Sequence, residues 1–276
     1  MRIGFSTQNF LKAMPFSTES LLELIRYASR EGYRFIELRD NQAERSTGEC
    51  RVLAAAAETA GIEIIYEIQV NLLHPGFGDI FEKALDNTVI FSEPGILRVT
   101  LSGSEFAVAD AGTGWSKEQL DRACSIAEGS ALVAEGKGVR LIVENLTEPF
   151  FGDPPDYYGL DDFFGNTRKV GMQFDLCNPF VSVSRKKAEP EKVASFLSTL
   201  GDRWVTTHIK TSIKGVPRPI VGESPLSVRK VTGLMGEAGV KYFALEMVAA
   251  EEREDAFSNH ESSLVYLEEQ AIIRRE

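Results

Sequence analysis

The segment Val133–Glu144 reads VAEGKGVRLIVE, and it holds the end of an amphipathic helix, a glycine turn and a β-rich run in direct succession. The same join recurs at Ser29–Leu38 (SREGYRFIEL), Glu58–Glu67 (ETAGIEIIYE) and Gly236–Glu246 (GEAGVKYFALE). Glycine just past a helix tolerates the left-handed conformation that closes the last turn, and the β-branched and aromatic residues after it favour a buried strand. Each join therefore predicts a helix that leads directly into a strand.

Working outward from these joins gives a chain in which strands and helices alternate. Strands are predicted near Arg2–Ser6, Arg34–Leu38, Ile62–Gln69, Ile96–Thr100, Val139–Glu144, Val170–Asp175, Trp204–Ile209 and Tyr242–Met247. Apolar residues at three- and four-residue spacing predict helices between them, at Thr18–Arg30, Lys117–Glu135, Pro190–Leu200 and Leu226–Ala238. Such alternation implies right-handed parallel crossovers, and eight of them close into a barrel. We therefore expect an α/β fold, a single (β/α)₈ TIM barrel domain spanning residues 1–276.

A doubly wound open sheet is the structural alternative. Its dinucleotide-binding form carries Gly-x-Gly-x-x-Gly after the first strand, whereas this chain continues as Ser6-Thr7-Gln8-Asn9. The sequence also shows no Pro-rich linker or shift in composition that would mark a domain boundary. Both observations favour the barrel.

Charge and composition narrow the classes of partner. The formal net charge of -11 opposes the polyanionic backbone of nucleic acid and anionic membrane surfaces. We therefore expect a small polar substrate, with no nucleic-acid partner and no membrane. The first residues lack the apolar run of a signal peptide, which predicts a cytoplasmic protein. The odd number and wide spacing of Cys50, Cys124 and Cys177 predict reduced, buried thiols.

A potential metal ligand stands at the end of each of the last four predicted strands. These residues are Glu144, Asp175, His208 and Glu246. Neighbouring parallel strands lie about 4.8 Å apart, so side chains at corresponding heights can point to one centre. A carboxylate that closes an apolar strand is costly to bury unless a cation compensates its charge. Three carboxylates and an imidazole suit Mn²⁺, Mg²⁺ or Co²⁺, with Zn²⁺ as an alternative.

These short stretches carry a family resemblance. Val143-Glu144-Asn145, Phe174-Asp175 with Asn178, His208-Ile209-Lys210 and Leu245-Glu246 together resemble the sugar phosphate isomerase/epimerase superfamily, the xylose-isomerase-like TIM barrels. In its ketose 3-epimerases a Glu, Asp, His, Glu set binds Mn²⁺ or a similar ion, and both glutamates exchange protons with the sugar. The resemblance implies that Glu144, Asp175, His208 and Glu246 bind one divalent metal ion, foremost Mn²⁺, and that Glu144 and Glu246 are also catalytic. It further implies a homodimer or homotetramer.

Three positions depart from the 3-epimerase pattern. Those enzymes often place His at the position of Asn178, an acid at that of Phe150 and Arg at that of Lys214. The retained metal set and altered surroundings leave several substrates open, namely another sugar, a keto-glycoside, an inosose or the substrate of a dehydratase.

Three further residues are substrate-binding candidates: His74, Asn178 and Lys210. His74 lies in the loop predicted after the third strand, where an ordinary loop histidine is the alternative. Lys210 follows the metal-ligand candidate His208 by two residues and would pair with a carboxylate ligand or a substrate oxygen; a solvated lysine at the barrel edge is the alternative. The aromatic segment Thr147–Asp162 is predicted to cover the pocket as a lid.

The resemblance, together with the metal-ligand set, implies a divalent-metal-dependent isomerase or epimerase that acts on a sugar or related polyol through an enediolate. A lyase or dehydratase on the same scaffold is the first alternative, because elimination begins with the same proton removal. An endonuclease-IV-like phosphodiesterase ranks lower, since it needs several additional His and acidic ligands and this chain has three histidines. A non-catalytic barrel subunit is the remaining alternative.

Overall fold

Eight parallel strands form a closed barrel in the computed structural model, which describes residues 1–101, 114–146, 148–181 and 188–273. The strands are β1 (Arg2–Ser6), β2 (Phe35–Asp40), β3 (Glu63–Asn71), β4 (Gly95–Thr100), β5 (Val139–Glu144), β6 (Gly171–Asp175), β7 (Trp204–Ile209) and β10 (Tyr242–Leu245). They follow one another around the barrel in the order β1-β10-β7-β6-β5-β4-β3-β2, and β1 closes it by pairing with β10. This closure confirms the predicted (β/α)₈ fold and excludes the open sheet.

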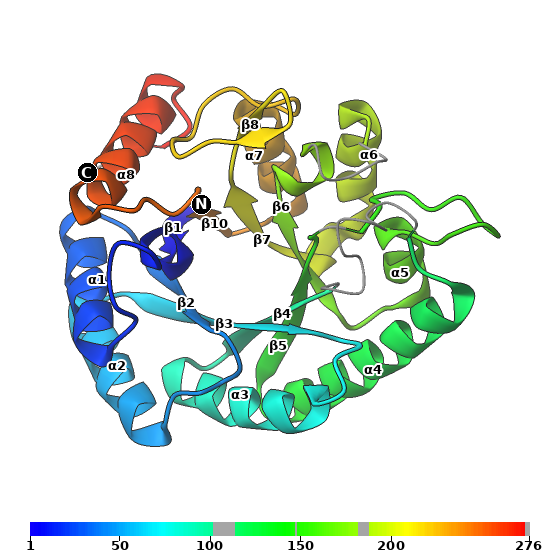
Figure 1. Cartoon of the computed structure of the whole chain (residues 1–276), viewed down its shortest axis with the longest axis horizontal. Helices are drawn as coiled ribbons and strands as arrows, with labels where there is room; N and C mark the ends of the chain where they lie inside the picture. The colour runs from blue at the N-terminus through cyan, green and yellow to red at the C-terminus, as the bar shows by residue number, and fades with distance from the viewer. Residues whose placement is uncertain (102–113, 147, 182–187, 274–276) are drawn as a thin grey trace.

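Helices surround the barrel (Figure 1). They are α1 (Thr18–Arg30), α2 (Thr47–Ala60), α3 (Phe77–Phe91), α4 (Lys117–Gly136), α5 (Leu160–Asn166), α6 (Pro190–Leu200), α7 (Val228–Ala238) and α8 (Arg253–Glu269). The short 3₁₀ helices are η1 (Thr7–Phe10), η3 (Asn178–Phe180) and η4 (Gly201–Arg203). Strands β8 (Ser212–Ile213) and β9 (Val216–Pro217) pair as a small antiparallel hairpin. Among the described residues, no helix has the length and apolar character needed to cross a membrane.

Glycines at the helix-to-strand joins have the conformation expected from the sequence. Gly32, Gly61, Gly138 and Gly239 all have positive φ, between 67° and 80°. A side chain in this left-handed region would be strained, so glycine lets each chain segment reverse directly into its strand. The four joins therefore confirm the local prediction on which the fold assignment rested.

The barrel interior is divided along its axis into an apolar part and a polar part. Its apolar part is built from six buried side chains, those of Phe35, Ile65, Ile96, Ile142, Val205 and Ala244. Two residues further along five of these strands, the inward positions become Glu37, Glu67, Arg98, Glu144 and Glu246. Because side chains alternate between the faces of a strand, this step of two keeps the charged groups inside the barrel, toward the carboxyl ends of the strands.

The larger apolar core fills the space between the strands and the helices. Phe150 belongs to this layer, since its ring lies 6.2 Å from that of Phe174 in β6 and 5.3 Å from that of Phe196 in α6. Thr147, the first residue of the predicted lid, lies outside the described residues, and the lid role of the segment stays a prediction. The three cysteines are free and buried, as expected.

Candidate metal centre

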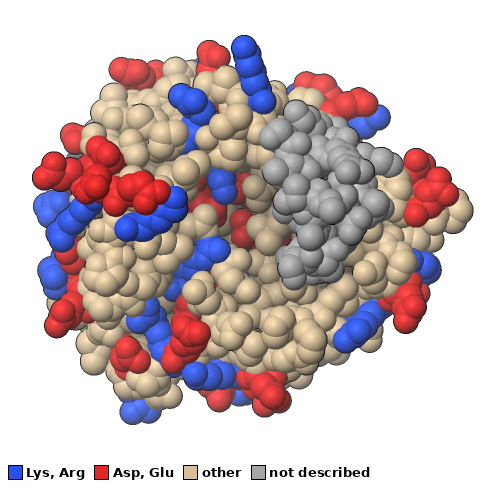
Figure 2. Space-filling model, viewed as in Figure 1, with Lys and Arg blue, Asp and Glu red and all other residues tan. Residues whose placement is uncertain are grey.

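The structure brings Glu144, Asp175, His208 and Glu246 together at the carboxyl ends of their strands. Each offers a ligand atom, and these atoms all lie within 4.8 Å of one another. All four side chains are buried. Figure 2 shows a hollow at the centre of the face, with acidic and basic atoms on its floor. The sequence prediction that these four residues converge is therefore correct in geometry.

His208 presents Nδ1 to the three carboxylates. Oε2 of Glu246 lies 2.5 Å from Nδ1, Oε1 of Glu144 lies 3.1 Å away, and Oδ2 of Asp175 lies 3.7 Å away. The other ring nitrogen, Nε2, lies 2.7 Å from Oε2 of Glu37. Metal-binding histidines commonly donate their second ring N–H to a carboxylate, which leaves the first nitrogen free to bind the metal. Glu37 therefore fixes the His208 ring in the orientation that turns Nδ1 toward the three carboxylates.

Asp175 is held by the backbone of the loop that follows it. Its Oδ1 accepts hydrogen bonds from the backbone N–H groups of Cys177 and Asn178, at 2.7 and 2.8 Å. Asn145 accepts from the Asp175 N–H at 2.8 Å and itself receives a bond from the Asn178 side chain. These bonds leave Oδ2 of Asp175 buried without a hydrogen-bond partner. One carboxylate oxygen is thus anchored and the other is directed at the centre.

Two cations lie against the carboxylates from different sides. Arg98 is fully buried and contacts Glu67 at 2.9 Å and Glu144 at 3.5 Å. Lys210 lies 2.9 Å from Oε1 of Glu246 and 3.6 Å from Oδ2 of Asp175. Gln8, in η1, donates to the same Glu246 oxygen at 2.9 Å. The centre is therefore a charged network rather than an isolated acidic cluster.

This network sets the protonation of the buried groups. Burial alone would raise the pKa of Glu246, but Lys210 and His208 outweigh it and hold that pKa well below its ordinary value. Burial would lower the pKa of His208, but Glu37, Glu246 and Glu144 raise it well above its ordinary value. Burial raises the pKa of Glu37 to about 7, although His208 opposes the shift. Without a metal, a protonated imidazole therefore joins Arg98 and Lys210 in balancing the negative charge of the carboxylates.

A divalent cation fits this set of groups. Oδ2 of Asp175 is buried and receives no hydrogen bond among the described residues, and Oε2 of Glu246 has the His208 ring nitrogen, 2.5 Å away, as its neighbour. An unpaired buried carboxylate oxygen is costly, and a bound cation removes that cost. Oxygen donors with a single imidazole match the preferences of Mn²⁺ and Mg²⁺. Glu144, Asp175, His208 and Glu246 would hold such an ion.

The three substrate-binding candidates have different surroundings. Lys210 lies at the centre, as described above. Asn178 lies beside it, but its side-chain amide donates to the Asn145 carbonyl at 2.8 Å and so supports the ligand loop. His74 lies between β3 and α3, where its Nδ1 accepts from the Gly76 N–H at 3.0 Å. The structure therefore joins Lys210 and Asn178 to the centre and gives His74 a local hydrogen bond.

Sequence reasoning missed the charged residues beneath the ligands, namely Glu37, Glu67 and Arg98. Glu37 and Glu67 form a second group of potential ligands with His208. Their signal was present in the sequence, since each charge interrupts an apolar strand: FIEL, IIYEI and ILRV. A charge within a run that is otherwise buried needs a partner inside the protein.

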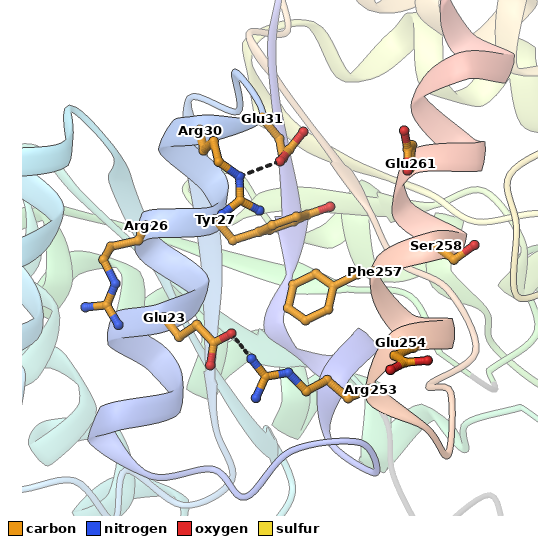
Figure 3. A pocket seen from close by; sticks show the side chains of 10 residues that line it. All are labelled: Glu23, Arg26, Tyr27, Arg30, Glu31, Arg253, Glu254, Phe257, Ser258 and Glu261. Atoms are coloured by element: carbon orange, nitrogen blue, oxygen red, sulfur yellow. Dashed lines mark hydrogen bonds and ion pairs between the residues drawn. The ribbon is translucent and has the colours of Figure 1, made fainter.

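A cavity of about 710 Å³ lies outside the barrel, between α1 and α8 (Figure 3). Tyr27 and Phe257 lie between the two helices, and charged side chains surround them. Four of these charges are paired locally, because Arg253 bonds to Glu23 and Arg30 bonds to Glu31. The two groups of potential metal ligands found in the described part of the chain both lie inside the barrel. We therefore place the functional site there.

No family model matches the chain, and no curated protein sequence matches it. Solved structures do match. A sugar phosphate isomerase/epimerase from Parabacteroides distasonis aligns with a TM-score of 0.71 and 13% identity, over 99% of this chain and 97% of that chain. An L-ribulose 3-epimerase aligns with a TM-score of 0.70 and 12% identity, over 100% and 99% of the two chains. A xylose isomerase-like TIM barrel protein from Mycobacterium smegmatis, solved in complex with magnesium, aligns with a TM-score of 0.69 and 16% identity, over 99% and 98%.

The fold is that of the xylose-isomerase-like TIM barrels. This confirms the resemblance read from the strand ends at the level of the fold. Identities of 12 to 16% establish no more than the fold. The chemistry of this chain depends on the residues of its candidate metal centre.

Proposed function

We propose that this chain is a divalent-metal-dependent isomerase or epimerase of a sugar or related polyol, acting through an enediolate as a single barrel domain over residues 1–276. The observation that carries the proposal is the convergence of Glu144, Asp175, His208 and Glu246 within 4.8 Å at the carboxyl ends of four strands. This is the rim at which barrels of this type place their chemistry. We further propose that the protein is cytoplasmic and forms a homodimer or a homotetramer.

The proposed metal is Mn²⁺, with Mg²⁺, Co²⁺ or Zn²⁺ as alternatives. Such an ion, when bound, polarises a substrate carbonyl and stabilises the negative charge of the enediolate. Glu37 keeps the His208 ring in the orientation that this binding needs. The backbone N–H groups after β6 keep one oxygen of Asp175 fixed.

Glu246 and Glu144 are the proposed proton acceptors and donors. Lys210 and His208 keep Glu246 ionised, which is the form that removes a proton from carbon. Strands β7 and β6 separate β10 from β5 around the barrel, so the two glutamates approach the centre from different sides. Epimerisation needs proton transfer on both faces of a planar intermediate, and this placement supports it. Isomerisation needs one base and is served by the same residues.

Lys210, Asn178 and His74 are the proposed substrate-binding residues. The Lys210 ammonium lies between Glu246 and Asp175, where a substrate oxygen would also come within reach. The same ammonium favours the lyase as second candidate, because it would donate a proton to a departing group after the first step. The phosphodiesterase is not supported, since both ligand groups in the described residues depend on the same histidine.

The decisive experiment is solvent deuterium incorporation. The Mn²⁺-loaded protein is incubated in D₂O with a panel of ketoses, inososes and keto-glycosides, and products are followed by NMR and mass spectrometry. Deuterium at a carbon next to the carbonyl, with no loss of water or aglycone, supports the isomerase or epimerase. Loss of water or aglycone supports the lyase. Metal-loaded protein that exchanges no C–H proton in any member of the panel contradicts both.

A further inference from the structure

Arg39 projects into the barrel above the charged network. It follows Phe35 and Glu37 at steps of two on β2, and both of those side chains lie inside the barrel. Its register partner on β3 is Glu67, another inward residue. Two residues of strand span about 7 Å, so Arg39 stands about that much nearer the rim than Glu37. The Arg39 N–H donates to Thr7 Oγ1 at 3.0 Å, which fixes its backbone.

The Arg39 guanidinium has no partner among the described residues. None of their side-chain hydrogen bonds or ion pairs engages it, and its Nε is buried without an acceptor. Arg98 and Lys210, the other two permanent cations of the site, each contact two carboxylates. A guanidinium presents five donors, and the buried Nε–H of Arg39 is costly to desolvate while it stays unused. The Arg39 guanidinium therefore has donors available for an anionic ligand.

Its neighbours do not supply the missing acceptor. Arg39 lines a cavity of about 220 Å³ at the carboxyl end of β2, together with the charged residues Asp40, Glu44, Arg45 and Glu49. Glu49 accepts from Ser46 and Thr18, and neither Glu44 nor Glu49 forms an ion pair with Arg39 among the described residues. Asp40 is adjacent, but its two oxygens already accept from the N–H groups of Glu44 and Arg45 and from the Tyr66 hydroxyl. Burial and the nearby Arg98 lower the pKa of Arg39, as expected for a desolvated cation beside another. An acceptor brought by a ligand would relieve both effects.

The same guanidinium is within electrostatic reach of the candidate metal centre. Glu246, Glu67 and Glu144 all act on Arg39, although none of them bonds to it. Because Arg39 faces the interior two residues nearer the rim than Glu37, it lies on the side of the centre toward which the far end of a bound ligand would extend. Figure 2 shows the hollow open at the surface, with basic atoms beside acidic ones.

We infer that Arg39 determines specificity by binding an anionic group, a carboxylate or a phosphate, at the end of the sugar remote from the reacting carbons. The inference rests on the proposed function and adds to it a substrate class, that of charged sugars. A guanidinium pairs with either anion through two parallel hydrogen bonds, which is why the chemistry is shared between the two.

Calorimetric binding to the Mn²⁺-loaded protein tests this inference without relying on turnover. D-Fructose, D-fructose 6-phosphate and D-fructuronate have the same chain length and differ at the terminal carbon. We expect at least one anionic ligand to bind about 10- to 100-fold more tightly than fructose, because a charge-assisted pair is gained. The anion that shows this advantage identifies the group as phosphate or carboxylate.

Substitutions assign the advantage to Arg39. Arg39→Gln should bring the ratio of anionic to neutral affinity close to one, and Arg39→Lys should retain part of it. The matched control is Arg51→Gln on the exposed face of α2, which should keep the wild-type ratio. Equal affinity of the wild type for all three ligands, failure to bind any of them, or an anionic advantage that survives in Arg39→Gln would overturn the inference.

The result of this binding experiment can be distinguished from the result of the deuterium-exchange experiment that tests the proposed reaction. Arg39-dependent anion binding without deuterium exchange would keep the anion site and refute the isomerase. Exchange with neutral sugars and no anionic advantage would keep the isomerase and refute the role of Arg39.

Discussion

His208 Nε2 lies 2.7 Å from Glu37 Oε2, and this contact decides which ring nitrogen faces the three candidate ligand carboxylates. Glu37 is itself held, since the Gln173 side chain donates to its other oxygen at 2.7 Å. The Glu37 carboxylate accepts a hydrogen bond from Nε2–H, which keeps the proton on Nε2 and leaves the Nδ1 lone pair for a metal. Glu37 and Gln173, which lie beneath the candidate ligands, therefore set the orientation of the His208 ring.

Glu37→Gln should lower the affinity for Mn²⁺ by about 10- to 100-fold, the usual effect of losing such a partner. A glutamine amide can donate to Nε2, which favours the tautomer with its proton on Nδ1. Titration of free Mn²⁺ by electron paramagnetic resonance gives the dissociation constant. Glu58→Gln, on the exposed face of α2, is the matched control and should bind as the wild type does. Equal affinity of Glu37→Gln and wild type would show that the contact does not orient the ligand.

Glu144→Gln and Glu246→Gln should each slow proton exchange with the substrate by about 100- to 10,000-fold, the range for loss of a general base. If the protein is an epimerase, each variant should lose exchange starting from a different epimer, because each glutamate serves one face. Deuterium uptake from each epimer in D₂O, at a Mn²⁺ concentration that saturates both variants, separates base loss from metal loss. Identical defects from both epimers would instead indicate an isomerase with one base.

Arg98→Met should destabilise the protein by about 3–5 kcal/mol, because it removes the buried guanidinium that contacts both Glu67 and Glu144. Burial would raise the pKa of Glu67, and Arg98 together with His208 instead lowers it to about 2. Urea unfolding of the metal-free protein measures the loss. Arg51→Met removes an exposed arginine and is expected to change stability by less than about 0.5 kcal/mol. A similarly small effect for Arg98→Met would mean that the ion pairs of Arg98 with Glu67 and Glu144 contribute little to stability.

His260 should make the folded protein less stable as the pH falls below its ordinary pKa. Burial lowers the His260 pKa from 6.5 to about 3, since its ring is enclosed by Phe5 and Phe10 and bonds to Tyr33 and Asn9. Between these values the unfolded chain binds the proton and the folded chain does not. Stability therefore falls by up to about 1.4 kcal/mol per pH unit from this residue.

Comparing wild type with His260→Gln tests that slope. Glutamine retains hydrogen-bonding capacity but does not titrate, so its variant should lose stability less steeply between pH 6.5 and pH 4. Urea unfolding at pH 7.5 measures any packing defect of the variant, because such a defect lowers the free energy of unfolding by the same amount at every pH. Parallel pH profiles for the two proteins would show that the ring is protonated in the folded state.

Local sequence determined the elements and the rim of the barrel. The glycines at Gly61 and Gly239 end their helices in the left-handed conformation, and the strands that follow begin within two or three residues of them. Glu144 and Asp175 end their strands as expected, and the regular alternation of elements implied that such ends would meet. These features depend on neighbours along the chain, which is why periodicity and turn chemistry reveal them.

Only the tertiary structure decided what lies around the ligands. Glu37 and His208 are 171 positions apart, and Arg98 reaches Glu144 from the neighbouring strand β4. Asn178, predicted to bind substrate, uses its side-chain amide to support the Asn145 carbonyl. Which charge finds a partner, and which, like that of Arg39, is left without one among the described residues, depends on inward-facing side chains from strands distant in the sequence. Barrel closure sets those contacts, and no local pattern encodes them.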